Sequence, residues 1–219
     1  MQIILLSLIA FFLFLKILSI ILKNIFLNYI STPLITVSII MLCLYGLYYK
    51  AGFHNFLITG GAVLSLAGDI FNLNEKKLVV DFKCGVLFFI MTQLFYFTAF
   101  TASYIFSFYQ IPAVLLYFTA FIFIVKLFPL KISSNFLKIE IMIYGFIISL
   151  TLLLSFFNLL DFYSLKNLYI FAGMFLFTLS DILLCTNLLY RKFSYYSIFV
   201  WLLYAPAQTL IALSIMLSK

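Results

Sequence analysis

The stretch Ile3 to Leu22 reads IILLSLIAFFLFLKILSIIL and holds one charged residue, Lys16, in twenty positions. A helix of about 20 apolar residues is long enough to cross the hydrocarbon core of a bilayer. The whole 219-residue chain has the same character, with 67% hydrophobic residues, 9% charged residues and a mean hydropathy of +1.26. Soluble domains are about 25% charged. The composition therefore predicts a polytopic membrane protein and excludes disordered, fibrous and disulfide-scaffold classes.

Short polar stretches divide the chain into eight apolar segments, each of which predicts a transmembrane helix. They cover residues 3–22, 33–49, 55–73, 85–106, 111–128, 139–157, 167–189 and 195–217. Segments of this length exclude a β-barrel, whose strands alternate and run about 10 residues. The first segment has no basic region and no small-residue cleavage site, so we expect a retained helix rather than a signal peptide. We predict one all-α polytopic membrane bundle over residues 1–219.

Basic residues are unequally divided between the two sides of the predicted bundle. One side receives nine of them: Lys23, Lys76, Lys77, Lys83, Lys126, Lys131, Lys138, Arg191 and Lys192. The other receives Lys50, Lys166 and Lys219. Positively charged loops stay in the cytoplasm, so we expect both termini outside. We read the net charge of +7 as this topology signal and expect no nucleic-acid partner. The Phe, Ile, Lys and Asn usage is typical of an AT-rich bacterial source, which indicates the inner membrane.

The cysteine and histidine content argues against two further classes of site. Three widely spaced cysteines, Cys43, Cys84 and Cys185, form neither a disulfide framework nor a metal motif. A single histidine, His54, cannot supply a zinc site of the usual three-ligand kind. We therefore expect no metal and no cofactor.

Two aspartates lie inside apolar segments: Asp69 in the third and Asp181 in the seventh. An intramembrane carboxylate costs roughly 2.5–3.5 kcal/mol on insertion scales, so it usually faces a bundle interior or a wet cavity. The predicted topology places both in the cytoplasmic half of the membrane. No basic residue lies in the same segments to pair with them. Paired carboxyl groups in different environments can divide acid and base roles, so we interpret the two as catalytic candidates.

Other polar residues accompany the aspartates within the predicted helices. Asn72 lies three residues after the first aspartate and shares its helical face. Gln93 and Tyr96 lie in the fourth segment, and Tyr204 and Gln208 share a face of the eighth at i,i+4 spacing. These side chains either join helices through hydrogen bonds or orient substrate and water at a site.

A weak internal repeat also appears. Asp69 and Asp181 are 112 positions apart, and Gln93 and Gln208 are 115 apart. This spacing predicts a parallel duplication of a four-helix unit, although the surrounding residues match poorly. Such repeats also occur in transporters.

Short motifs surround these positions along the chain. In chain order they are Pro33-Leu34, the stretch Ser65-Leu66-Ala67-Gly68-Asp69, then Gly85, Phe89 and Tyr96, then Gly173 and Ser180-Asp181, and finally Tyr204 and Ala207-Gln208. In order and spacing they resemble the motifs of the YhhN family of lysoplasmalogenase-like membrane proteins. The resemblance covers about residues 30–215. Two positions depart from the family pattern, which usually has lysine at Thr32 and histidine at Gln93.

The resemblance implies hydrolysis of the vinyl ether bond of a lysoplasmalogen, with a fatty aldehyde and a glycerophospho-base as products. One carboxyl group would protonate the alkene and the other would stabilise the cation and activate water, as Asp69 and Asp181 could do without a metal. Tyr204 and Gln208 could orient the water or the leaving oxygen. The lysolipid could enter from the cytoplasmic leaflet with its head group near Lys76, Lys77, Arg191 and Lys192.

The residues leave two other functions open. Buried carboxylates and a repeat would equally serve a small secondary transporter. The departures at Thr32 and Gln93 also allow an inactive lipid-binding protein or scaffold. The sequence does not indicate the oligomeric state.

Overall fold

The computed structural model describes residues 1–73, 78–102, 104, 107–127, 135–189 and 195–217, and within these ranges the chain is helical with no β-strand. This confirms the predicted all-α fold. The α-helices are α1 (Gln2–Ile21), α2 (Ile25–Tyr49), α3 (Phe53–Asn72), α4 (Leu78–Thr101), α5 (Ile111–Leu127), α6 (Asn135–Asp161), α7 (Leu165–Leu189) and α8 (Tyr196–Ser214). Two short 3₁₀ turns, η1 (Phe108–Gln110) and η2 (Ile215–Leu217), precede α5 and follow α8.

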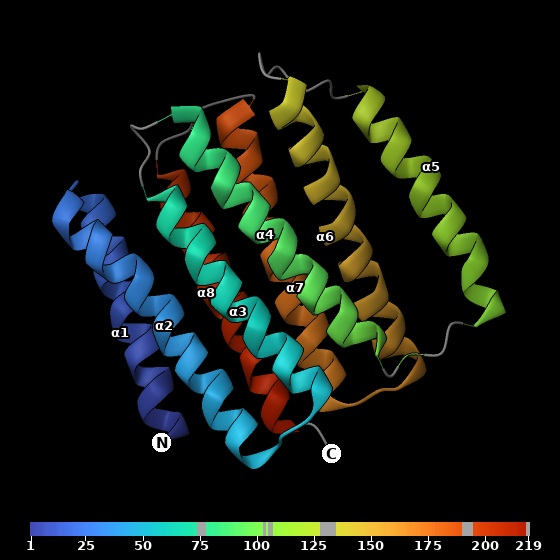
Figure 1. Ribbon diagram of the computed structural model, residues 1–219, viewed down its shortest axis with the longest axis horizontal. Helices are drawn as coiled ribbons and strands as arrows, with labels where there is room; N and C mark the ends of the chain where they lie inside the picture. The colour runs from blue at the N-terminus through green and yellow to red at the C-terminus, as the bar shows by residue number, and fades with distance from the viewer. Residues whose placement is uncertain (74–77, 103, 105–106, 128–134, 190–194, 218–219) are drawn as a thin grey trace.

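Six helices close into a ring. In order around it, α2 packs on α3, α3 on α4, α4 on α6, α6 on α7, α7 on α8, and α8 back on α2. The first helix, α1, covers the seam between α2 and α8. The fifth, α5, lies at the opposite edge of the molecule (Figure 1), where the Tyr117 hydroxyl donates to the Phe146 carbonyl of α6 at 2.8 Å.

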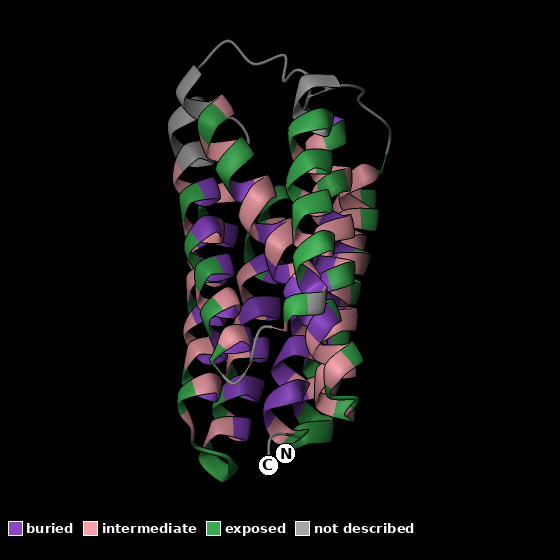
Figure 2. Cartoon of the chain, turned by 90° about the vertical axis from the view of Figure 1, so that its right-hand side faces the viewer, coloured by how far each residue is buried: buried purple, intermediate pink, exposed green. Residues whose placement is uncertain are grey.

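The outer surface of the bundle is apolar. Large side chains such as Ile3, Phe14 and Leu116 are 79%, 62% and 70% exposed, and Figure 2 shows buried residues running along the length of the helices beneath exposed ones. Soluble proteins do not expose apolar surface on this scale. The exposed surface is consistent with an integral membrane protein.

Within the described part of the chain, six helical stretches are long and apolar enough to span a membrane: Gln2–Ile21, Ile25–Tyr49, Cys84–Thr101, Lys138–Asp161, Leu165–Asn187 and Tyr196–Leu217. The apolar part of α5, Ile111–Phe123, is shorter. Helix α3 is 20 residues long but more polar. It buries its polar side chains, including Asn55, Thr59 and Asp69, inside the bundle.

The predicted start of the second span at residue 33 was wrong. Helix α2 begins at Ile25, where the Asn24 side chain caps it by accepting the Leu27 N–H at 3.0 Å. Pro33 therefore lies in the helix interior, where it removes one backbone donor without ending the helix. The extension brings Asn28 and Thr32 into the helix. The boundaries of the fourth span also differ, since α4 covers Leu78–Thr101 instead of 85–106.

Both termini lie at the same end of the bundle (Figures 1 and 2), as an even number of antiparallel crossings requires. The α2–α3 and α6–α7 turns lie at this end as well, whereas the α1–α2 turn lies at the other. Asp69 is three residues from the far end of α3 and Asp181 eight residues from that of α7. Both aspartates therefore lie in the half of the bundle away from the termini. Which side of a membrane this half faces stays a prediction.

Candidate active site

Asp69 is the centre of a buried polar network. Its side chain is 6% exposed, and its Oδ2 atom accepts hydrogen bonds from the Thr36 hydroxyl of α2 at 2.5 Å and from the Tyr204 hydroxyl of α8 at 3.1 Å. A buried carboxyl group needs such donors, because an unpaired one is expensive in a low-dielectric interior. Three helices therefore converge on one carboxyl group.

The network continues along α8 towards α4. The Gln208 amide donates to the Tyr204 hydroxyl at 3.5 Å, and the Tyr96 hydroxyl donates to Gln208 Oε1 at 2.6 Å. Tyr96 lies close to α3 because residue 61 is glycine: a Cβ atom there would come within 2.4 Å of the Tyr96 ring. The structure thus joins Asp69, Tyr204, Gln208 and Tyr96, four of the predicted site residues, in one hydrogen-bonded chain.

Lys16 enters the same region from α1. Its side chain is only 4% exposed, and its ammonium group donates to Asn28 Oδ1 and, at 2.6 Å, to Thr32 Oγ1. The ammonium also lies 4.6 Å from the centroid of the Trp201 ring, within cation–π distance. Two neutral oxygens and an aromatic face therefore surround a positive charge inside the bundle.

A single face of α2 connects this lysine to the aspartate. Asn28, Thr32 and Thr36 follow one another at i,i+4 spacing, so their side chains lie one above the next. Four residues of helix rise about 6 Å. The Lys16 ammonium at Thr32 and the Asp69 carboxyl group at Thr36 are thus separated by about one helical turn.

Asp181 forms a second cluster. It is half-buried and accepts a hydrogen bond from the Tyr144 hydroxyl of α6 and a longer one from Ser180 at 3.5 Å. The Phe89 ring lies between the clusters, with centroids 6.5 Å from Tyr144 and 6.2 Å from Tyr204. The carboxyl groups of Asp69 and Asp181 share no hydrogen bond among those described.

Two predicted site residues stand apart from these hydrogen bonds. Gln93 is fully buried on the face of α4 that holds Phe89 and Tyr96, and both polar atoms of its side chain lack a hydrogen-bond partner among the described residues. Asn72 is half-buried and directs its Oδ1 atom, also unpartnered there, towards Gly85 of α4. An orphaned buried amide such as that of Gln93 is a group that a bound ligand could satisfy.

The sequence reasoning missed Lys16, Thr36 and Tyr144 as site residues. The sequence could have indicated Lys16, because a charge in the middle of an apolar segment is costly and usually functional. Threonine and tyrosine are common in membrane helices, so nothing in the sequence distinguishes Thr36 and Tyr144 as site residues. The proposed head-group contacts Lys76, Lys77, Arg191 and Lys192 lie outside the described residues.

The halves of the chain place their aspartates in a similar way. A hydroxyl from the second helix of each half, Thr36 of α2 or Tyr144 of α6, donates to the aspartate on the third, Asp69 of α3 or Asp181 of α7. This arrangement accords with a duplicated four-helix unit, which stays a prediction.

Among the described residues no group of three or more His, Cys, Asp and Glu side chains could hold a metal ion.

Comparison with known proteins extends the motif evidence over most of the chain. The sequence profile of the YhhN family matches residues 27–215, from the start of α2 to the end of α8. No curated protein and no solved structure matches significantly. The matched segment contains both aspartates and every helix of the ring. The chain belongs to the YhhN family.

Proposed function

We propose that this protein is a membrane-embedded hydrolase that cleaves the vinyl ether bond of a lysoplasmalogen-type lysolipid. The observation that supports this most strongly is the buried network around Asp69, with a second carboxyl group, Asp181, across the Phe89 ring. Membership of the YhhN family is compatible with a hydrolase. The apolar exterior suits a substrate that arrives from the bilayer.

The proposed reaction needs one acid and one base. The protonated carboxyl group donates its proton to the β-carbon of the vinyl ether, giving an oxocarbenium ion. The second, ionised carboxylate stabilises this cation and accepts a proton from the water that attacks the α-carbon. The resulting hemiacetal collapses to a fatty aldehyde and the glycerol hydroxyl. Such positioned proton transfer typically contributes 10²–10⁴-fold to the rate.

The two aspartates suit these roles in different ways. Asp69 is buried and held by two hydroxyl donors on other helices, so its position is well defined. Asp181 is half-buried, and its neighbour Ile182 is 55% exposed on the outside of the bundle. A lipid that approaches from the membrane would therefore meet α7 near Asp181.

Lys16 gives the proposal a counter-charge for the lysolipid phosphate. Three glycerol carbons separate the vinyl ether oxygen from the phosphate oxygen, a span similar to the turn of about 6 Å between Thr32 and Thr36. A phosphate at the Lys16 ammonium would thus place the vinyl ether near Asp69. The family pattern usually has lysine at position 32, and here the ammonium of Lys16 lies 2.6 Å from the Thr32 hydroxyl. In this chain a lysine on α1, Lys16, supplies at Thr32 the positive charge that the family pattern has on α2.

The decisive experiment measures aldehyde release from a vinyl ether lysolipid by the purified protein in detergent. We expect release by the wild type, unaffected by chelators, and its loss in both Asp69→Asn and Asp181→Asn. Asparagine keeps the shape of aspartate and its ability to accept a hydrogen bond, so both variants should elute and unfold like the wild type. Near-wild-type release by either folded variant would refute the two-carboxylate mechanism. A folded wild type that releases no aldehyde but moves a solute unchanged into proteoliposomes would identify a transporter.

A further inference from the structure

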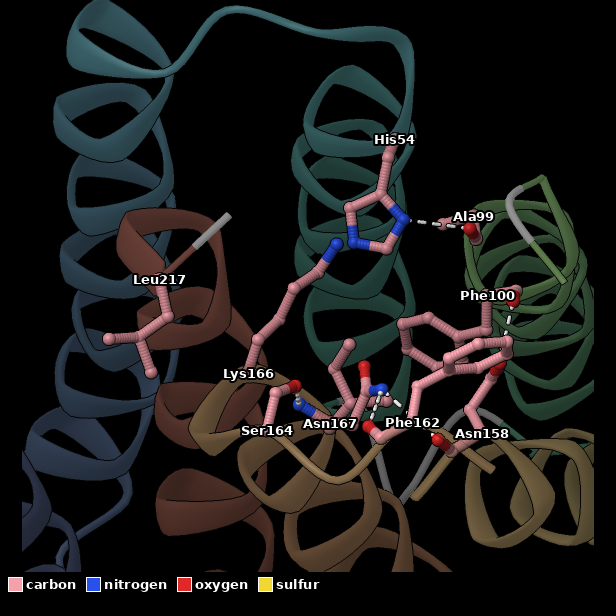
Figure 3. Close-up of a pocket in the computed structure, with 10 residues that line it drawn as sticks. His54, Ala99, Phe100, Asn158, Phe162, Ser164, Lys166, Asn167 and Leu217 are labelled. Atoms are coloured by element: carbon pink, nitrogen blue, oxygen red, sulfur yellow. Dashed lines mark hydrogen bonds between the residues drawn. The ribbon is translucent and has the colours of Figure 1, made fainter. Parts of the chain in front are cut away.

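A cavity of about 310 Å³, drawn in Figure 3, opens at the end of the bundle that bears the termini. It lies at the opposite end of α3 from Asp69. Its polar groups come from the first turn of α3 (His54), the end of α6 (Asn158) and the start of α7 (Lys166 and Asn167). Its apolar wall includes Phe100, Phe162, Ile170 and Leu217. Small-molecule pockets typically occupy about 300–1,000 Å³ and combine apolar walls with a few convergent polar groups. The cavity meets both criteria.

His54 directs an unpartnered ring nitrogen into this cavity. Its Nδ1 atom lies 2.7 Å from the Ala99 carbonyl oxygen, and a carbonyl only accepts, so Nδ1 holds the hydrogen. The neutral ring then has its lone pair on Nε2, which is buried and has no hydrogen-bond partner among the described residues. Figure 3 shows the Lys166 side chain extending towards this face of the ring. An acceptor and a cationic donor thus point into one space.

The neighbouring polar groups already have partners. The Asn158 amide donates to the Phe100 carbonyl at 2.9 Å, and the Asn167 amide donates to the Asn158 and Phe162 carbonyls. The nearby carboxylate of Asp161 accepts from Tyr104 and from Gln110 instead. Ser164, which also lines the cavity, accepts the Asn167 N–H at 3.1 Å. The ionisable groups left to meet a ligand are Lys166 and His54.

The protonation state of the His54 imidazole determines which hydrogen-bonding groups a ligand in this cavity must have. His54 lies just before the apolar segment 55–73. Burial of the imidazole and the positive charge of Lys166 lower the pKa of His54 from 6.5 to about 4. At neutral pH the ring is therefore uncharged and Nε2 accepts. The complementary ligand must donate one hydrogen bond and present an anionic oxygen to the ammonium. A phosphate monoester, with a second pKa of about 6, offers both a P–OH hydrogen and an anionic oxygen in about half of its molecules at pH 6, whereas a carboxylic acid with a pKa of about 4 has lost its proton there.

We propose that this cavity binds a phosphate monoester, free or at the head of a lipid, with Lys166 holding an anionic oxygen and His54 accepting the P–OH hydrogen. The site is independent of the proposed hydrolase centre. It would be the second ligand site of the protein, at the opposite end of the bundle.

The single histidine makes the test direct, because every histidine NMR signal comes from His54. Protein with ¹⁵N-labelled histidine in maltoside detergent is titrated at pH 6 with inorganic phosphate, with lysophosphatidic acid, or with sulfate at equal ionic strength. We expect phosphate or the lipid to shift the Nε2 signal saturably and sulfate, which has no proton to donate, to leave it in place. A response to lysophosphatidic acid alone would identify a lipid head group as the ligand.

Two lysine variants separate binding from bulk charge. Lys166→Met should weaken the response at least tenfold, because it removes the charge-assisted hydrogen bond. Lys50→Met, which removes an exposed lysine at the same end of the bundle, should leave the response unchanged. Asp69→Asn should also respond normally, which distinguishes this site from the hydrolase centre. Equal shifts with sulfate, no shift with either phosphate, or a full response in folded Lys166→Met would each overturn the proposal.

Discussion

Replacing Tyr204 by phenylalanine removes one oxygen atom from the Asp69 network and leaves the ring in place. The ring is held by Phe177 and Trp201, each with centroids 5.3 Å away, and by Phe89 at 6.2 Å. None of these contacts involves the hydroxyl. The hydroxyl donates to Asp69 Oδ2 at 3.1 Å and accepts from Gln208 at 3.5 Å. The substitution therefore removes one hydrogen bond to the carboxyl group, together with the longer bond from Gln208, and keeps the packing of the ring.

The expected magnitude follows from the strength of that bond. Hydrogen bonds to charged groups contribute about 1.5–3 kcal/mol, and each 1.36 kcal/mol is tenfold in rate. The full range corresponds to a loss of about 10- to 150-fold in kcat/KM. At 3.1 Å the Tyr204 bond is longer than the 2.5 Å bond from Thr36, which remains. We therefore expect the lower end, about 10- to 20-fold.

The assay is aldehyde release from a vinyl ether lysolipid, with thermal unfolding measured on the same samples. At the lower end of the same range, losing this hydrogen bond costs about 1.5 kcal/mol, which lowers the unfolding midpoint by about 3–6 °C in a chain of this size. Tyr117→Phe is the matched control, because its hydroxyl bonds to α6 at the edge of the bundle. If folded Tyr204→Phe keeps wild-type kcat/KM, or loses no more than the control, the hydroxyl does not support the reaction and the role assigned to the network is wrong.

Three further results are expected. Lys16→Met should raise KM for the lysolipid about tenfold with a smaller change in kcat, and Lys16→Arg should restore part of the affinity; a change in kcat alone would refute phosphate anchoring. Gly173→Ala should destabilise the protein by about 1–3 kcal/mol in thermal unfolding, because its Cβ would lie 2.9 Å from the Ala207 carbonyl oxygen. Gly145→Ala, with no atom within 4 Å of its Cβ, should not. Reporter fusions to the two termini should both report an outside location; a cytoplasmic C-terminal fusion would reverse the predicted topology.

Sequence alone predicted the helical membrane-type fold and the identity of its most unusual residues. Apolar segments of about 20 residues have few structural alternatives, because backbone polar groups must bond within the helix in lipid. Asp69 and Asp181 stood out since no charge is expected in such segments. Helix boundaries were less accurate: the proline at position 33 suggested a helix start, but the Asn24 cap lies nine residues earlier.

Tertiary structure decided which polar groups meet. Lys16 is 53 positions from Asp69 in sequence, and only the packing of α1 on α2, and of α2 on α3, brings its ammonium within about a turn of the carboxyl group. Similarly, Tyr204 reaches Asp69 because α8 closes the ring against α2 and α3. Hydropathy determines that a segment spans the membrane, since that depends on the segment's own composition. The neighbours of each polar side chain depend on how the helices are rotated and paired, which is a property of the whole bundle.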